Sequence, residues 1–320
     1  MLISVCVPVF NGQRFLRQAF DSVLSQNYKY YELVISDDGS SDNSWQIIKE
    51  YESKFTVKTI IIRSNNIGIS ANCNLLARKS NGRYLKFLFQ DDILKVNALE
   101  CFISKVSKHD NVTLAFSDRS ILFEDRAQQE CQDIFSGCQD LALNWSVINE
   151  FQPGSKLLED PNLLISPINK VGEPSNTLIL KSAFHESGGF DPLINQLLDI
   201  DLWFRLMTLG NVVYIGENLT KFRIHNSQQS VLNARYSDIS EDFLKLYTKI
   251  LTLNIFNSLS ENFRKRIFES FKCILIKNAS KTERQEYLGT IKKLKEEYLG
   301  TTKKLTERIQ FIESTFVWRF

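Results

Sequence analysis

The sequence predicts an α/β fold, in which a mainly parallel sheet is flanked by helices and followed by an all-helical extension. Two observations predict the sheet. Apolar runs rich in β-branched residues alternate with amphipathic stretches through the first half of the chain, and short polar connections separate them. This alternation is typical of βαβ units, whose strands run parallel and are buried. A third observation predicts the extension, because from about Ser237 onward the chain shows helical patterns only.

The expected elements of the first half alternate strictly along the chain. Strands are predicted at Leu2–Pro8, Glu32–Ser36, Lys58–Ile62, Tyr84–Phe89 and Val112–Phe116. Helices are predicted between them, near Gln13–Ser25, Asp42–Tyr51, Ser70–Lys79 and Asn97–Val106. Because ligands bind at the carboxyl ends of the strands in such sheets, the residues that follow each strand are the first candidates for a functional site.

The second half of the chain begins with a less regular segment, Glu124–Val171, in which we predict no element. A strand-like run follows at Asn176–Leu180, then a helix near Ile200–Leu209 and a further strand at Val212–Ile215. These patterns divide the chain into a domain and an extension. The domain covers 1–236, with halves at about 1–120 and 121–236, and the helical extension covers 237–320.

The extension contains an internal repeat, since Glu286–Leu294 recurs as Glu297–Leu305. Apolar residues also recur seven apart, with Lys and Glu between them, at Ile291, Tyr298, Leu305 and Ile312. Heptad spacing predicts a coiled-coil arm, through which the chain would form a homo-oligomer. A single amphipathic helix packed on its own domain is the alternative. The closing Phe316–Phe320 is aromatic and basic, which suits an interface or peripheral association with a membrane surface.

Composition excludes several classes of protein. The 320 residues include 39 basic and 37 acidic side chains, and this balance argues against a dedicated nucleic-acid binder. We find no signal peptide and no apolar stretch of the roughly 18–20 residues that span a bilayer, so the protein is expected to be cytoplasmic. The six cysteines form no CxxC pair, so reduced thiols are expected and a zinc site is not.

The first two strands end in motifs suited to a ligand. Pro8-Val9-Phe10-Asn11-Gly12 makes a sharp exit from the first strand, which lets backbone groups face a ligand, although alone it is only a turn. The second strand ends in Asp37 and Asp38, and adjacent carboxylates at the end of a buried strand are costly unless compensated. The residues that follow them serve as helix caps, whereas this pair is not needed for capping. A carboxylate here could accept hydrogen bonds from a base N–H or a ribose hydroxyl.

Two further motifs follow the next strands of the predicted sheet. Asn65–Asn74 is a loop with Gly68 at a special backbone angle, leading into a helix. Asp91 and Asp92 follow the fourth strand, and such a pair could hold Mg²⁺ or Mn²⁺ together with substrate phosphates and water. A helix N-cap would explain the pair equally well if it stood alone.

These motifs, together with Ser22–Gln26, occur in an order and spacing that resemble glycosyltransferase family 2. In the second half, Glu173–Asn176 and Gly188–Asp191 resemble the acceptor-side segment of the family. Leu198–Arg205 resembles its Glu-Asp-x-Asp-x-Trp-x-Arg helix, and Phe222–Ser227 resembles its Tyr-Arg-x-His element. The resemblance covers about residues 1–230 and implies a GT-A-type fold.

The resemblance also implies roles for individual residues. The catalytic base would be Asp199, and the divalent metal would be bound by Asp92 and His225. The alternative for His225 is a histidine of the surface or the core with no role at the donor. The nucleotide-sugar donor would be bound around Pro8, Val9, Asn11, Asp37, Asp38, Asn66, Gly68, Asn74 and Asp91. Phe89 and Leu198 stand where the family pattern has acidic residues, so the motif departs from the family there.

The function that follows from the resemblance is an inverting glycosyl transfer. The donor would be a nucleoside-diphosphate sugar, by default a UDP-sugar, and the acceptor a glycan or lipid-linked glycan of a bacterial surface polysaccharide, on the inner face of the plasma membrane. A non-catalytic nucleotide-sugar-binding or assembly module, acting through its helical arm, is the alternative. A nucleotidyltransferase is disfavoured, because Val7–Gly12 lacks the basic, glycine-rich character of a phosphate loop.

Overall fold

The computed structural model describes residues 1–124, 140–228, 239–252 and 260–278. The helical repeat of the extension and the closing Phe316–Phe320 lie outside the described residues, and so does the coiled coil expected there. The strands are β1 (Ile3–Val9), β2 (Tyr31–Asp37), β3 (Thr59–Arg63), β4 (Tyr84–Phe87), β5 (Ile93–Leu94), β6 (Val112–Phe123), β7 (Phe151–Pro153), β8 (Thr177–Leu180) and β9 (Asn211–Ile224).

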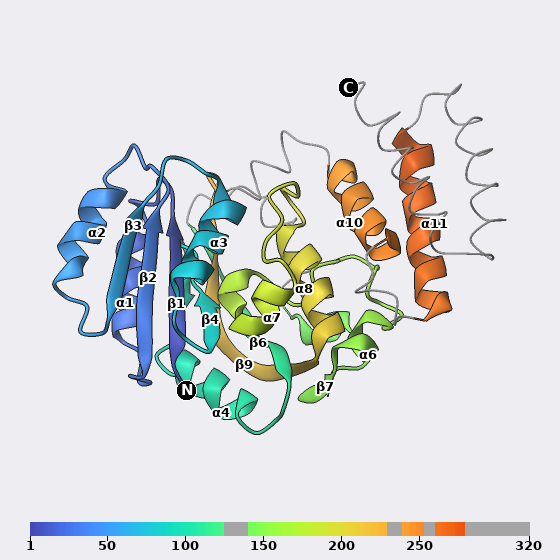
Figure 1. Cartoon of the computed structure of the whole chain (residues 1–320), viewed down its shortest axis with the longest axis horizontal. Helices are drawn as coiled ribbons and strands as arrows, with labels where there is room; N and C mark the ends of the chain where they lie inside the picture. Colours follow the sequence, from blue (N-terminus) through green and yellow to red (C-terminus); the bar gives the residue numbers. More distant parts are fainter. Residues whose placement is uncertain (125–139, 229–238, 253–259, 279–320) are drawn as a thin grey trace. The chain divides into compact units, whose positions relative to one another are not determined.

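The helices lie between these strands and after them (Figure 1). In chain order they are α1 (Leu16–Leu24), α2 (Ser44–Glu52), α3 (Ile69–Lys79), α4 (Ala98–Val106), α6 (Gly154–Leu158), α7 (Lys181–Glu186), α8 (Leu198–Leu209), α10 (Ser240–Thr252) and α11 (Glu261–Asn278). Two short 3-10 helices, η1 (Ala142–Asn144) and η2 (Pro174–Asn176), complete the described elements.

Among the described residues, the strands form one sheet in the order β3-β2-β1-β4-β8-β6-β9-β5, with β7 paired to β9. Strands β1 to β4 are parallel, β8 runs against its neighbours, and β6 and β9 are again parallel to each other. The predicted α/β fold with a mainly parallel sheet is therefore confirmed. The short strands β5 and β7 pair antiparallel to β9.

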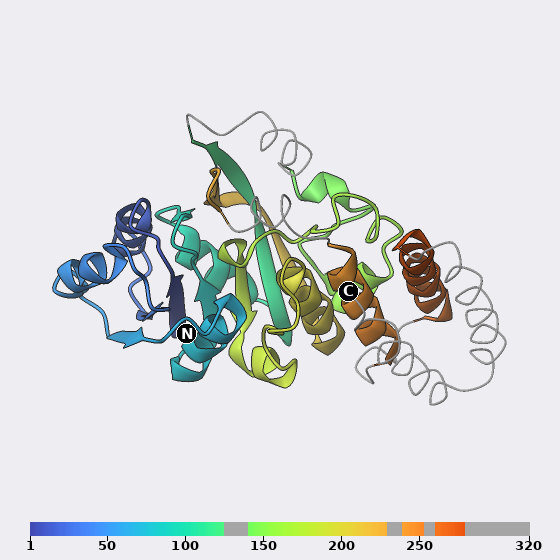
Figure 2. The ribbon, with the colours of Figure 1, turned by 90° about the horizontal axis from the view of Figure 1, so that it is seen from above.

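Alternate side chains of the central strands point to opposite faces of the sheet, and each face is covered by helices. On one face, α1, α2 and α4 pack with residues such as Val5 and Val7 of β1 into a continuous apolar core. On the other face lie α3, whose Asn72 donates to the Ser36 carbonyl at 3.2 Å, and α7, whose Phe184 packs on Phe87. Figure 2 shows these two helical layers from above. Burial on both faces explains why the strands read as continuous apolar runs.

The predicted elements differ from the observed ones mainly in the second half. The strands predicted at Val112–Phe116 and Val212–Ile215 are longer in the structure, because β6 and β9 pair with each other along most of their length. The segment Glu124–Val171, where we predicted no element, contains η1, β7 and α6. These elements are too short to show a hydrophobic period in the sequence.

The chain divides into two compact units. The first contains residues 1–193 and 198–236, and the second contains 194–197 together with 237–320. The second unit therefore takes in a short segment, Ile194–Leu197, that directly precedes α8 in the chain. The functional division at residue 236 that we expected from the sequence stays a prediction.

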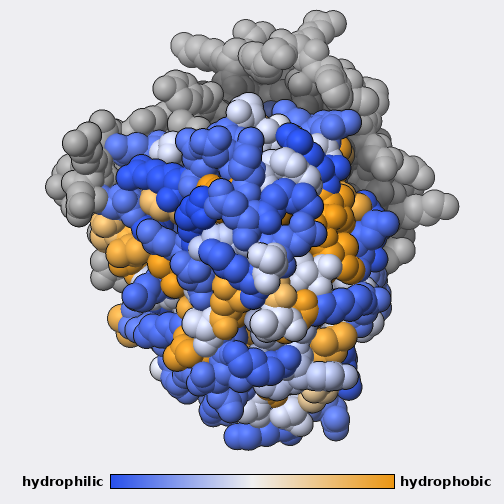
Figure 3. Space-filling model, turned by 90° about the vertical axis from the view of Figure 1, so that its left-hand side faces the viewer, coloured by the Kyte–Doolittle hydropathy of each residue, from blue (hydrophilic) through white to orange (hydrophobic). Residues whose placement is uncertain are grey.

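The surface over α1 and α2 is mainly hydrophilic, with small separate apolar patches (Figure 3). Among the described helices, none combines the length and the low charge that a membrane span requires.

Candidate active site

The site lies at the carboxyl ends of the parallel strands, at the upper edge of the sheet in Figure 1. The register pairs Val9 at the end of β1 with Asp37 at the end of β2, and the backbone N–H of Asp38 donates to the Val9 carbonyl at 2.7 Å. Gln90, just after β4, joins the loop that follows β1. Its side chain accepts from the Phe10 N–H at 2.8 Å and donates to the Phe10 carbonyl at 2.9 Å. Three strand ends are thereby held together.

The turn that follows Pro8 and Val9 is built by Asn11 and Gly12. Asn11 has a φ of 50°, and its side-chain oxygen accepts from the N–H of Ser41 at 2.9 Å. A Cβ on Gly12 would lie 2.3 Å from Gln90 Oε1, so a larger residue there would displace the Gln90 side chain that binds Phe10. Asn11 therefore ties the loop after β1 to the loop after β2, and its amide oxygen has a structural partner.

Asp38 organises the loop that leads into α3. Its carboxylate is 3% exposed and accepts from Ser64 Oγ at 2.7 Å, from the Ile67 N–H at 2.8 Å and from the Gly68 N–H at 2.8 Å. Asn66, with a φ of 52°, and Gly68, with a φ of 87°, take the left-handed conformations that this turn needs. Asp38 thus stabilises the shape of the loop at the strand ends.

Asp37 has a different environment from its neighbour. It is fully buried at the end of β2 and forms an ion pair with Arg63 at the end of β3, Nε to Oδ2 3.3 Å. The Arg63 guanidinium also lies over the Trp45 ring at 4.9 Å. The two carboxylates of this pair therefore have different partners. Asp38 binds backbone N–H groups of the loop before α3, and Asp37 pairs with Arg63 of β3.

The second acidic pair lies where β4 ends and faces the end of β9. His225 Nε2 lies 3.1 Å from Asp91 Oδ2, and its Nδ1 lies 2.9 Å from Ser227 Oγ. Asp92 is 1% exposed and accepts from the Arg223 N–H at 3.1 Å. Burial, then the Asp91 carboxylate, raises the pKa of Asp92 well above its usual range, although hydrogen bonds from Ser175 and Arg223 oppose this. His225 is thus paired with Asp91, whereas Asp92 lies buried.

Arg223 holds this corner together. Its Nε donates to the Asp91 carbonyl at 2.8 Å, and its two terminal nitrogens bind Glu124 at the end of β6 and Gln18 of α1. The guanidinium lies 4.4 Å from the Phe15 ring centroid, and Phe15 also packs on the His225 ring at 4.8 Å. A planar group with several fixed donors can make all these contacts at once.

Asp91 and His225 fit a divalent cation of the Mg²⁺ or Mn²⁺ type. Such a cation uses one or two protein ligands and completes its shell with phosphate oxygens and water. Asp91, at 22% side-chain exposure, is open to a ligand, while Ser227 orients the imidazole from its other nitrogen. Within the described ranges no three His, Cys, Asp or Glu side chains converge as a closed metal site, so the substrate would have to supply the remaining oxygens.

Asp199 lies in the first turn of α8 and is only partly buried. Its Oδ2 accepts from Asn169 Nδ2 at 2.7 Å, and its Oδ1 accepts from the Ile200 N–H at 2.8 Å. Burial, reinforced by the nearby Glu173 carboxylate, raises the pKa of Asp199 to about 7. An aspartate with such a pKa is half ionised near neutral pH, which suits a general base.

Glu173 interacts electrostatically both with the Asp91–Asp92 pair and with Asp199. It forms an ion pair with the buried Arg119 of β6, Nη1 to Oε2 3.1 Å. Burial raises its pKa, the Asp91 carboxylate adds to that rise, and Glu173 in turn raises the pKa values of Asp92 and Asp199. From the sequence we placed Glu173 only in the segment Glu173–Asn176, because its partner Arg119 lies on β6, far away in the sequence.

Asn74 lies on α3 and holds the Gly188–Asp191 segment. Its Nδ2 donates to the Phe190 carbonyl at 2.8 Å, and its Oδ1 accepts from the Phe190 N–H at 2.9 Å. A Cβ on Gly189 would lie 2.5 Å from Asn74 Oδ1. The Asn74 amide thus forms a two-bond contact with the backbone of the Gly188–Asp191 segment.

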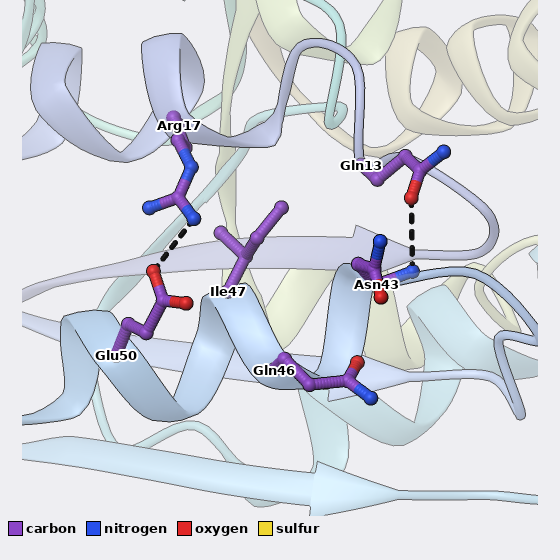
Figure 4. Close-up of a pocket in the computed structure, with 6 residues that line it drawn as sticks. All are labelled: Gln13, Arg17, Asn43, Gln46, Ile47 and Glu50. Atoms are coloured by element: carbon purple, nitrogen blue, oxygen red, sulfur yellow. Dashed lines mark hydrogen bonds and ion pairs between the residues drawn. The ribbon is translucent and has the colours of Figure 1, made fainter.

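A separate hollow lies between α1 and α2 (Figure 4). Arg17 and Glu50 form an ion pair across it at 2.6 Å, and Gln13 accepts from the Asn43 N–H at 3.0 Å. The close-up shows Arg17 and Glu50 meeting on one side of the hollow and Gln13 and Asn43 on the other. This hollow is distinct from the strand ends that carry the acidic residues.

Comparison with solved structures identifies the fold. Residues 1–349 of S. aureus TarS in complex with UDP-GlcNAc superpose with a TM-score of 0.62 at 16% identity, covering 87% of this chain and 74% of that one. The mannosyltransferase PcManGT from Pyrobaculum calidifontis, in complex with GDP-Man and Mn²⁺, superposes with a TM-score of 0.58 at 11% identity, covering 99% and 81%. At this identity the likeness shows the fold, which is the GT-A fold of glycosyltransferases.

Sequence comparison identifies the family. Residues 4–157 match the model described as glycosyl transferase family 2. An uncharacterized glycosyltransferase of Rickettsia prowazekii is 28% identical over 254 residues, which cover 78% of this chain and 73% of that protein. One from Haemophilus influenzae is 24% identical over 233 residues, covering 72% and 67%. The chain is similar to glycosyltransferase family 2 over residues 4–157, and together with its relatives this makes it a glycosyltransferase.

Proposed function

We propose that the protein transfers a sugar from a nucleoside-diphosphate sugar to an acceptor hydroxyl, with inversion at the anomeric carbon. The observation that carries the proposal is the row of carboxylates from Asp91 and Asp92 through Glu173 to Asp199, whose charges act on one another. Such a concentration of negative charge is costly in an empty site, and a cationic or protonated partner offsets it. Perturbed carboxylates of this kind gather at functional sites.

The donor side of the proposed site is the edge formed by the loops after β1, β2 and β4. Backbone groups following Pro8 and the loop held by Asp38 would bind the nucleoside, because both are shaped before any ligand arrives. A pre-shaped loop binds with less loss of conformational entropy. Asp37 forms an ion pair with Arg63, so in this proposal its charge stabilises the end of β3 and does not bind the ligand.

Asp91 and His225 would hold a divalent cation beside the donor diphosphate. When bound, the cation stabilises the negative charge that grows on the departing nucleoside diphosphate. Asp92, buried behind Asp91, fixes the Arg223 backbone through its carboxylate. Our sequence-based prediction that Asp92 itself binds metal stays a prediction, and the pairing of His225 with Asp91 favours Asp91 for that role.

Asp199 would act as the general base on the acceptor. It would take the proton of the acceptor hydroxyl while that oxygen forms a bond to the anomeric carbon and the bond from that carbon to the diphosphate breaks. The carboxylate is held in one orientation, because Asn169 binds Oδ2 at 2.7 Å and the Ile200 N–H binds Oδ1 at 2.8 Å. General base catalysis of this kind contributes about 10²–10⁴-fold to the rate.

For the donor we propose a UDP-sugar, and for the acceptor a glycan or lipid-linked glycan of a bacterial surface polysaccharide. The TarS structure that resembles this chain was determined with UDP-GlcNAc, which supports the choice of base. The PcManGT complex contains GDP-Man and Mn²⁺, so a guanosine donor is the competing candidate, and it supports a cation at the diphosphate.

A binding panel tests the proposal. UDP-, GDP-, dTDP- and CDP-sugars are each added with Mn²⁺ or with EDTA, and the melting temperature is recorded for wild type, Asp91→Asn and the exposed control Asp110→Asn. Binding to the native state raises the melting temperature by mass action. We expect one nucleotide class to give a Mn²⁺-dependent rise that Asp91→Asn abolishes and Asp110→Asn retains. The absence of any such rise in the wild type would refute the proposal.

A further inference from the structure

Glu173 lies on a short piece of chain that connects the two ends of the proposed site. The carbonyl of the preceding Gly172 accepts from Asn169 Nδ2 at 3.2 Å, and the same nitrogen donates to Asp199 Oδ2 at 2.7 Å. Trp203 of α8 also donates to the Gly172 carbonyl, with Nε1 at 3.1 Å. Because one amide nitrogen binds both groups, the backbone just before Glu173 is held close to the Asp199 carboxylate.

The other end of this piece of chain is bound to the strand end that carries the acidic pair. The Ser175 hydroxyl accepts from the Phe89 N–H at 2.9 Å and forms a hydrogen bond with Asp92, which opposes the rise in the pKa of that carboxyl. The Ser175 carbonyl accepts from Thr220 Oγ1 of β9 at 3.0 Å. Glu173 is thus fixed on one side toward the proposed base and on the other toward the acidic pair.

The Glu173 side chain keeps a carboxylate that can still accept hydrogen bonds. It is 17% exposed, and its Oε2 lies 3.1 Å from Nη1 of the buried Arg119. No donor of the described residues forms a hydrogen bond with Oε2, so the ion pair leaves acceptor capacity on this group. The Glu173 charge also interacts with those of Asp91, Asp92 and Asp199. A carboxylate with unused acceptor capacity therefore lies between the two ends of the site.

The sugar of a bound donor would lie at this point. In the function proposed above, the diphosphate lies at the cation beside Asp91, and the acceptor oxygen lies at Asp199. The anomeric carbon is bonded to the diphosphate before transfer and to the acceptor oxygen afterwards, so the sugar ring has to lie between them. Sugar hydroxyl groups donate hydrogen bonds, and a hydrogen bond to an ionised acceptor is about twice as strong as a neutral one.

We propose that Glu173 is a specificity-determining residue, whose carboxylate accepts a hydrogen bond from a hydroxyl group of the transferred sugar. This inference rests on the function proposed above. Arg119 holds the carboxylate from its buried side. A site that binds a hydroxyl group through a buried polar side chain discriminates against a sugar that lacks this hydroxyl, because the side chain is then left without its partner.

The test compares the affinity for a donor with the affinity for its nucleoside diphosphate alone. Isothermal titration with Mn²⁺ measures UDP-GlcNAc and UDP first, and then the best donor of the binding panel with its own nucleoside diphosphate. The variants are Glu173→Gln and Glu173→Asp, of which the second keeps a negative charge beside Arg119 and shortens the side chain by one methylene. Glu186→Gln, at an exposed carboxylate of α7, is the control.

We expect both Glu173 variants to bind the donor about tenfold more weakly than wild type and the nucleoside diphosphate within about twofold of wild type. Normal binding of the nucleoside diphosphate would also show that the variants are folded. Glu186→Gln should change neither affinity. An equal loss for donor and nucleoside diphosphate would mean that Glu173 acts on the fold or on the diphosphate. That result, or an unchanged donor affinity, would overturn the inference.

A series of deoxy donors, each lacking one hydroxyl group, identifies the group that Glu173 binds. Removing that hydroxyl should weaken binding to the wild type about tenfold and leave binding to Glu173→Gln unchanged, since the contact is already lost there. Equal losses in both proteins for every deoxy donor would contradict the inference. A wild type that binds neither donor nor nucleoside diphosphate refutes the proposed function, whereas variants that match a binding-competent wild type refute only the role of Glu173.

Discussion

The proposed donor edge and the proposed acceptor side of the site are built in different ways. At the donor edge, polar side chains such as Asp38 and Asn11 bind backbone N–H groups of loops close by in the sheet. On the acceptor side, charged groups such as Glu173 and Asp199 are desolvated by packing, and their pKa values are raised. The proposed donor edge is thus organised by hydrogen bonds to backbone N–H groups, and the proposed acceptor side by unfavourable charge burial.

This difference shows at which carboxylates the requirements of folding stability and of catalysis conflict. A carboxylate bound by several N–H groups stabilises both the fold and the ligand loop, so the same interaction serves both. A buried carboxylate with a raised pKa costs stability whenever it is ionised, yet ionisation is what a base requires. We therefore expect substitutions on the acceptor side to lower activity and preserve stability, and those at the donor edge to lower both.

The largest effect is expected for Asp199→Asn. Asparagine keeps the size of the side chain and a hydrogen-bonding oxygen for Asn169 but cannot accept the proton, so turnover should fall about 10³-fold. Donor affinity should stay within twofold, because the donor edge is untouched. Steady-state turnover and donor titration measure the two effects, with the exposed Glu186→Gln as control. Loss of donor binding in parallel with turnover would remove the distinction between the two regions.

The next effect is a dependence of turnover on pH. Since the pKa of Asp199 is raised to about 7, turnover should rise through pH 7 and fall about tenfold for each pH unit below it. Stability should move the opposite way. Between about pH 4 and 7 the folded state binds the proton more tightly than the unfolded state, so this group's contribution to stability declines as pH rises through that range.

Melting curves at pH 5 and pH 8 check the stability half of that prediction. Relative to wild type, Asp199→Asn should be stabilised at pH 8 by about 1–2 kcal/mol and much less at pH 5. An equal change in stability at pH 5 and at pH 8 would mean that ionisation of the Asp199 carboxylate does not destabilise the folded state. The turnover profile of the wild type would then need another group to explain it.

Arg223→Lys sharpens the comparison from the donor side. Lysine keeps the charge but cannot bind the Asp91 carbonyl, Glu124 and Gln18 together. We expect the affinity for Mn²⁺ and donor to fall about tenfold and the free energy of unfolding to fall by about 1–2 kcal/mol. Isothermal titration and denaturant unfolding test this, with Arg14→Lys at the exposed partner of Glu124 as control. A change in turnover alone would contradict it.

The smallest effect is expected for Asp38→Asn. One amide oxygen can replace only part of the three-bond acceptor set, so the loop at Ile67 and Gly68 should loosen and stability should fall by about 1 kcal/mol. Donor affinity should drop a few-fold. Asp37→Asn is the comparison, since its partner Arg63 is half exposed. A larger loss of affinity in Asp37→Asn would reverse the roles given to this pair.

The sequence by itself determined the alternation of strands and helices and the acidic motifs at the strand ends. Both are local properties, since hydrophobic period and turn chemistry involve residues near in the chain. The alternation predicted β1 to β4 and the helices between them to within a few residues. The motifs were also enough to indicate the resemblance to the family, because their order and spacing can be read directly from the sequence.

Only the tertiary structure decided how these residues meet. His225 lies beside Asp91 across 134 positions, Asn74 binds Phe190 across 116, and Glu173 pairs with Arg119 of a distant strand. Which member of an acidic pair is buried depends on strand register and on the neighbouring element, and neither is encoded by the pair itself. The raised pKa of Asp199 arises in the same way, from burial and from the Glu173 carboxylate that folding brings close.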